Sequence, residues 1–119
     1  MSQNIDWATI VKIHDSYITS ATGSFSRNIN ISTIPNGAMF GVIATGFVNM
    51  NAGGNACVVV SYNGVNSTNM WVDNSTGNRG AFPICVCMTF TKVSGQNTLT
   101  LKSTTANGVN DKGFDTIVL

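Results

Sequence analysis

Apolar and polar residues alternate along most of this chain with a period of two, which is typical of half-buried β-strands. In the clearest case, Phe25, Ile29 and Ile31 lie on one side of a segment whose other side carries short polar residues. The same pattern predicts further strands over residues 7–13, 40–47, 56–62, 70–72, 82–90, 98–102 and 114–119. No segment shows the 3.6-residue period of an amphipathic helix.

Turn-forming residues separate these predicted strands. Asn63-Gly64 is the strongest short hairpin signal, and Pro35 followed by Asn36-Gly37 predicts a second tight turn. Runs of Asn, Gly, Ser and Thr predict loops over residues 51–55, 73–80, 94–97 and 105–113. We therefore expect one all-β domain over residues 1–119, a jelly-roll sandwich of about eight to ten short antiparallel strands.

The composition narrows the function classes. Only 9% of the 119 residues are charged, Glu is absent, and the net charge is +1, with the six Lys and Arg residues scattered. The sequence therefore lacks the cluster of basic residues that nucleic-acid binding requires. No apolar run reaches the roughly 20 residues that cross a bilayer. The first residues contain neither a basic nor an apolar signal region, so we expect a soluble protein made without a signal peptide.

Three cysteines form no recognisable metal or disulfide pattern. Cys85 and Cys87 share one face of a predicted strand, where we expect small buried apolar residues rather than a disulfide. A tetrahedral metal site would need Cys57 or His14 in addition, and no paired CxxC motifs are present. We expect neither a metal nor an organic cofactor.

Catalysis has little support in the sequence. His14 is the only histidine, and Asp15 would point to the opposite face of a continuing strand. No Ser or Cys lies in a nucleophile elbow, and five scattered aspartates without any Glu argue against paired-carboxylate chemistry. We therefore expect a binding protein rather than an enzyme, with His14 as a polar residue near a strand end.

The order of several short motifs resembles the tumour-necrosis-factor-like and complement-type globular heads. These motifs are Thr22-Gly23-Ser24-Phe25, Ile34-Pro35 with Phe40 beyond it, Asn63-Gly64, the pair Leu99 and Leu101, and the segment Phe114 to Leu119. The resemblance implies a jelly roll that forms a homotrimer. The low charge and the mean hydropathy of +0.16 agree with burial of some surface in a partner.

A narrower resemblance lies between residues 71 and 82. Ser75-Thr76-Gly77-Asn78-Arg79 is similar to the sugar-binding loop of the TNF-like, fucose-binding lectin domains of bacterial superlectins. In that family a Ser-Thr-Gly-Arg segment and a nearby aromatic residue hold the sugar at a protomer boundary. The resemblance nominates Ser75, Thr76 and Arg79, with Trp71 in the place of the aromatic residue; Asn78 is an insertion relative to the family pattern.

The residue types of this loop also suit a sugar ligand. Sugar hydroxyls donate and accept hydrogen bonds and the C–H face of the ring stacks on a flat apolar platform, roles that Arg79, Asp73 and Trp71 can fill. Tyr62 is a further candidate contact. Three alternatives stay open: Trp71 as a core aromatic, Arg79 as a solvated or interface charge, and the loop as half of a calcium site.

These observations predict a carbohydrate-binding protein, a lectin in the cell-adhesion class, that recognises fucosylated or related glycans as a homotrimer. Such a protein would act at a cell surface, extracellularly or on a virion. The alternative is a structural or attachment protein of a phage particle, in which the same jelly roll and its polar surface would serve assembly.

Overall fold

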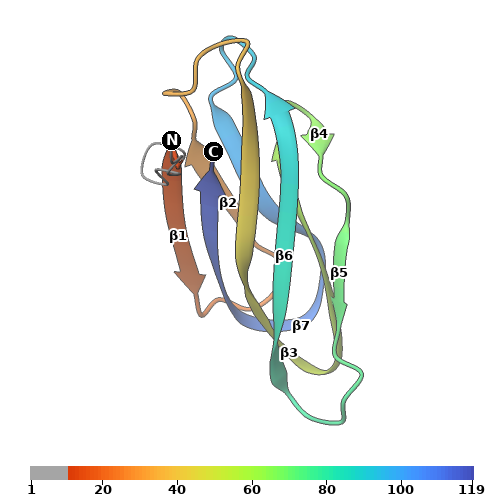
Figure 1. Ribbon diagram of the computed structural model, residues 1–119. Helices are drawn as coiled ribbons and strands as arrows, with labels where there is room; N and C mark the ends of the chain where they lie inside the picture. Colours follow the sequence, from red (N-terminus) through yellow and green to blue (C-terminus); the bar gives the residue numbers. More distant parts are fainter. Residues whose placement is uncertain (1–10) are drawn as a thin grey trace, which may run out of the picture.

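Over the residues that the structure describes, the regular elements are all β-strands, as the alternating pattern predicts. The computed structural model describes residues 11–119 (Figure 1), so the predicted strand over residues 7–13 falls largely outside the described residues. The strands are β1 (Ile13–Thr19), β2 (Ser26–Asn30), β3 (Met39–Tyr62), β4 (Val65–Asn66), β5 (Met70–Asp73), β6 (Gly80–Thr91) and β7 (Thr98–Val118). Within this range no helix is long and apolar enough to cross a bilayer.

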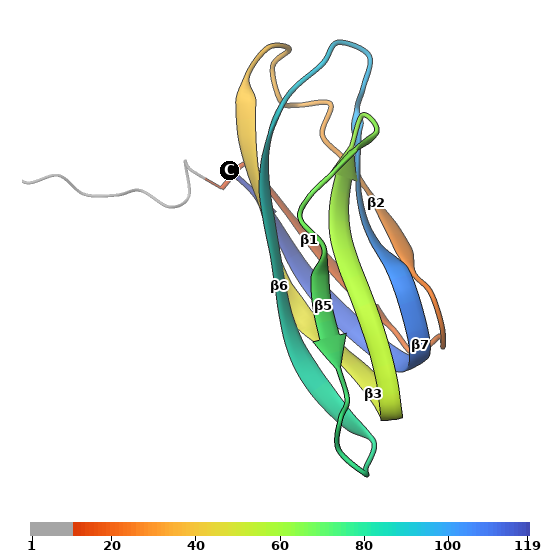
Figure 2. The same ribbon diagram turned by 90° about the vertical axis from the view of Figure 1, so that its right-hand side faces the viewer.

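Two long strands, β3 and β7, pair with each other antiparallel and pass through both layers of a sandwich (Figure 2). In what we call the first layer, the order is β1, the C-terminal half of β7, the N-terminal half of β3, and β6. In the second layer, the order is β2, the N-terminal half of β7, the C-terminal half of β3, and β5. The short β4 extends the second layer beside the end of β3.

The connectivity is that of a jelly roll. When the halves of β3 and β7 are numbered separately and β4 is set aside, the chain has eight strand segments in sequence order. The first layer then contains segments 1, 8, 3 and 6, and the second layer contains segments 2, 7, 4 and 5. Every step along the chain except that from segment 4 to segment 5 therefore passes from one layer to the other, and the all-β sandwich is confirmed.

The loops predicted over residues 51–55 and 105–113 are wrong, because both segments are continuous strand. They are the bends at which β3 and β7 leave one layer and enter the other. Gly53 and Gly108 have φ values of 76° and 65° there, and Asn55 still pairs with Asn107. Turn-forming residues thus allow a sharp bend, while pairing between the two strands keeps the backbone hydrogen-bonded.

The core lies between the two layers and is built from inward-facing apolar side chains. Its largest fully buried members come from the two long strands and their neighbours: Phe40, Ile31, Met50, Leu99, Leu101, Val42, Val48, Val58, Val60 and Val86. On β6, Ile84 and Val86 point inward, so Cys85 and Cys87 are exposed on the outer face. The expectation that these two cysteines are buried is therefore wrong.

The predicted Asn-Gly hairpin is confirmed at the end of β3. Asn63 and Gly64 have φ values of 49° and 77°, and Tyr62 pairs directly with Val65 across them. Two successive residues with positive φ make the turn whose twist suits a two-residue hairpin, and Asn-Gly accepts that backbone at low cost.

Candidate functional site

The loop between β5 and β6, at the lower end of the molecule in Figure 1, is fixed by Asn74. This side chain is 1% exposed, and its Nδ2 lies 3.1 Å from the backbone oxygens of both Met50 and Asn51 and 2.9 Å from that of Asn78. Its Oδ1 accepts from the backbone N–H of Thr76 at 3.0 Å. Asn74 is thus an anchor of the loop to the bend of β3, not a surface group that can meet a ligand.

Arg79 ends this loop on the outer face of the first layer. Its Nε donates to Oδ1 of Asn49 at 3.1 Å, and its Nη2 lies 3.4 Å from Oδ1 of Asp111. Asn49 lies between the buried Val48 and Met50, so its side chain points outward. The Arg79 side chain stays 58% exposed, which leaves most of its planar donor fork accessible.

The two hydroxyl residues of the loop differ in their surroundings. The Thr76 hydroxyl lies 2.6 Å from Oδ1 of Asn74 and 2.8 Å from the backbone oxygen of Asn78, so it is engaged within the loop. Ser75 is exposed beside it. Of the two, Ser75 is the better placed to contact a ligand.

Trp71 and Arg79 do not come together within one chain. Val72 packs against the core, so its neighbours Trp71 and Asp73 point outward from the second layer, on its outer face. Trp71 is 55% exposed and lies opposite Cys57 on β3. Because the loop carries the chain from the second layer to the first, the aromatic platform and the guanidinium lie on opposite faces of the sandwich.

Tyr62 lies in the core, away from the loop. Its side chain is 3% exposed and packs against Phe40 and Phe90. The hydroxyl donates to the backbone oxygen of Gln96 at 2.8 Å and accepts from the backbone N–H of Val93 at 2.8 Å. Its nomination as a sugar contact is corrected: Tyr62 fixes the turn between β6 and β7.

Paired amides join β3 to β7 at their bends. Asn110 donates to Oδ1 of Asn51 at 3.0 Å, and Asn107 donates to Oδ1 of Asn55 at 2.7 Å. Sequence reasoning placed all four in loops and assigned them no role. In the sequence these residues are visible only as members of two Asn-rich segments. That the two segments pair follows from the register of β3 against β7.

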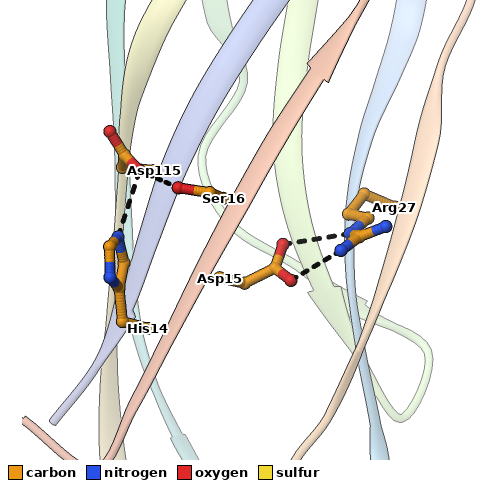
Figure 3. Close-up of polar contacts among 5 residues, drawn as sticks. All are labelled: His14, Asp15, Ser16, Arg27 and Asp115. Carbon is orange, nitrogen blue, oxygen red and sulfur yellow. Dashed lines mark hydrogen bonds and ion pairs between the residues drawn. The ribbon is translucent and has the colours of Figure 1, made fainter.

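A second polar cluster lies on the outer face of the first layer, centred on Asp115 of β7 (Figure 3). Ser16 donates to its Oδ1 at 2.6 Å, and Nε2 of His14 lies 3.0 Å from the same oxygen. These contacts, that of Ser16 above all, lower the pKa of Asp115 below its ordinary value. Ser16 and His14 both contact Asp115 and do not contact each other through the histidine ring. In a nucleophile triad the histidine lies between the hydroxyl and the acid, so the order of the three groups differs here.

This cluster forms one wall of a depression of about 180 Å³. Its lining combines hydroxyl, carboxylate, apolar and glycine residues: Ser16, Ile18, Thr45, Gly46, Phe47, Gly113, Phe114 and Asp115. The apolar side of the depression depends on Gly113, because a Cβ there would lie 2.9 Å from the Phe47 ring and 3.3 Å from Ile18, so glycine lets both side chains lie close over the strand. Sequence reasoning missed this site, since its members come from three strands.

A larger depression, of about 490 Å³, lies where β1, the start of β3 and the end of the chain meet. Its lining is mostly apolar and includes Ile34, Pro35, Met39 and Leu119. Among the described residues that line it, Thr33 and Lys12 carry the polar side chains and none has a carboxylate side chain. It therefore lacks the combination of acceptors and donors that the smaller depression has.

Comparisons with known proteins give no relatives: no family model, no curated protein and no solved structure matches this chain. Over residues 11–119, no three or more His, Cys, Asp or Glu side chains are grouped so that they could hold a metal ion. The function must therefore be argued from the surface geometry described above.

Proposed function

We propose that this protein is a non-catalytic glycan-binding domain, a lectin for fucosylated or related sugars. The observation that carries the proposal is the exposed guanidinium of Arg79, held by Asn49 of β3 and Asp111 of β7. A planar donor fork beside carboxylate and amide acceptors matches the mixed hydroxyl groups of a sugar. Ser75 adds an exposed hydroxyl at the rim.

The aromatic part of this site would come from a second copy of the chain. Trp71 and Arg79 face opposite sides of one sandwich, so a contact between the two faces of successive protomers would bring them together. Such a heterologous contact closes into a ring when the rotation allows it, as in a homotrimer. Several weak sites on one trimer would bind a glycan-covered surface with raised avidity.

A glycan array tests the proposal. Wild type should bind a defined set of glycans, and Arg79→Ala should lose at least about tenfold in apparent affinity, since it removes charge-assisted hydrogen bonds. Lys102→Ala removes a cation from the second layer, far from Arg79 in the fold, and should bind as wild type does. If wild type binds no glycan, the proposal is wrong.

Mixed oligomers test whether two protomers share the site. Trp71→Ala and Arg79→Ala proteins are refolded separately and together, and the products are measured on the same array. Under the proposal each variant alone binds poorly, while the mixture regains binding at boundaries that combine an intact Arg79 with an intact Trp71. A mixture no better than its components, from variants that both bind poorly, would contradict a site shared between protomers.

One observation favours the second candidate, a structural or attachment protein of a phage particle. Ile18 and Met39 are 81% and 73% exposed, both on the outer face of the first layer. Large apolar side chains at that exposure suit an assembly contact. Sedimentation distinguishes the candidates: closed trimers with glycan binding favour the lectin, and open-ended assembly without glycan binding favours the structural protein.

A further inference from the structure

We propose that the depression between Phe47 and Asp115 is a second sugar subsite, which holds one ring of an oligosaccharide whose next ring lies at Arg79. The proposal takes its ligand class from the proposed function but uses different residues, all within one chain. It implies that this protein recognises extended glycans rather than single sugars.

The acceptor of the subsite is the free oxygen of Asp115. Ser16 and His14 both contact Oδ1, and no side chain of the described residues donates to Oδ2. Figure 3 shows this second oxygen directed away from both donors. A carboxylate has about four lone-pair positions, so Oδ2 can accept hydroxyl hydrogens from a sugar while Oδ1 stays fixed by its two protein partners.

The apolar wall of the subsite is formed by Phe47 and Ile18 on either side of Gly113. The three residues lie in one row across β3, β7 and β1, because Phe47 pairs with Gly113 and Gly113 pairs with Ile18. The two larger side chains close over the glycine, since a Cβ there would lie 2.9 Å from the Phe47 ring and 3.3 Å from Ile18, and they form an apolar surface on which the C–H face of a sugar can pack. At about 180 Å³ the space is below the roughly 300 Å³ at which drug-sized pockets begin, and it suits a single ring.

The subsite is continuous with the surface around Arg79. On β3 the outward positions run Asn49, Phe47 and Thr45, at steps of about 6.6 Å. Facing them on β7, Asp111 and Asp115 lie four residues apart, which corresponds to about 13 Å along a strand. Two carboxylates at that separation, with an aromatic ring between them, offer contacts to more than one sugar ring.

Three variants test the subsite on an array that carries mono-, di- and trisaccharide members of each glycan series. Asp115→Asn removes the charge of the acceptor and preserves its shape, and Phe47→Leu removes the ring. Gly113→Ala forces the Phe47 ring and Ile18 to shift but replaces no donor or acceptor. Val65→Ala, which trims an exposed apolar side chain on β4, is the control. Thermal melting identifies any variant that fails to fold.

Wild type should prefer the longer members of a series, and each of the three variants should lose about tenfold on these while changing little on monosaccharides bound at Arg79. If wild type binds glycans and the folded variants match it on every chain length, the subsite is wrong and the lectin proposal stands. If wild type binds no glycan, both proposals are wrong.

Discussion

The carboxylate of Asp15 and the guanidinium of Arg27 form a two-point ion pair, with Nη2 and Nε of Arg27 at 2.8 and 3.0 Å from the two carboxylate oxygens (Figure 3). Asp15 belongs to β1, an edge strand of the first layer, and Arg27 belongs to β2, an edge strand of the second. The pair therefore connects the two layers along one open side of the sandwich. It also raises the pKa of Arg27.

Arg27→Lys keeps the charge but loses the planar fork, so it should destabilise the protein nearly as much as Arg27→Met does. The reason is that a single ammonium cannot satisfy both carboxylate oxygens with the same geometry. Urea unfolding of the two variants and of Asp15→Asn measures this. Full retention of stability by Arg27→Lys would show that charge alone connects the layers.

Lys112 is buried, and its Nζ donates to the backbone oxygens of Ala21 and Gly23 at 2.8 Å each. It thereby fixes the connection between β1 and β2. Lys112→Met should lower the free energy of unfolding by about 2 kcal/mol, because two partly buried carbonyl groups lose a charged donor. Lys102→Met, at a half-buried position on the same strand, serves as the control in the denaturant titration.

Burial also lowers the pKa of Lys112 below its ordinary value of 10.5. Between the folded and unfolded pKa values the unfolded chain binds more protons, so stability should rise with pH in that window. Wild type should therefore gain stability relative to Lys112→Met as the pH increases toward 10.5. A constant difference in the free energy of unfolding between the two proteins across this pH range would contradict a lowered pKa of Lys112.

Most of the strands could be predicted from the sequence, because alternation records which face of a strand is buried. On β6 the alternation correctly groups Ile84 and Val86 on one face, which is the inward one, but the apolar character of Cys85 and Cys87 wrongly suggests burial of the other face as well. The bends of β3 and β7 could not be predicted in this way. Asn and Gly indicate a loop locally, whereas here the pairing of Asn55 with Asn107 on another strand keeps both segments extended.

The candidate site was harder to predict, because nearness in sequence is not nearness in space. Trp71 and Arg79 are eight positions apart, yet the loop between them crosses from one layer to the other. Conversely, His14 and Asp115 are separated by 101 positions and lie in contact. Periodicity predicts the face on which a side chain lies, but only strand order and register identify its partners.

Asn74→Asp should destabilise the protein by about 3 kcal/mol, because it replaces a buried donor by a charge that faces three backbone oxygens. Asn78→Asp, in the same loop but exposed, should change stability by less than about 0.5 kcal/mol. Thermal and denaturant unfolding of the two variants provide the comparison. Equal effects would mean that Asn74 does not anchor the loop.

Two glycines of β3 should respond differently to substitution by alanine. A Cβ at Gly46 would lie 1.9 Å from the backbone oxygen of Gly113, so Gly46→Ala must displace β7 and should cost at least about 2 kcal/mol. A Cβ at Gly41 would meet only Leu119, at an ordinary 3.9 Å, and Gly41→Ala should be tolerated. Melting temperatures decide the point, and a stable Gly46→Ala protein would mean that β3 and β7 are less closely packed there.

The free energy of unfolding at acid pH should depend on the contacts of Asp115. Its folded pKa lies below the ordinary 3.8, so its stabilising effect is present above that pH and disappears as the pH falls through the folded value. Wild type should therefore exceed Asp115→Asn in stability near neutral pH and converge with it in acid. Ser16→Ala removes the larger cause of the shift and should move the Asp115 titration, followed by NMR of its carboxyl carbon, back toward 3.8. A wild-type titration midpoint at or above that value would show that the Ser16 and His14 contacts do not stabilise the carboxylate.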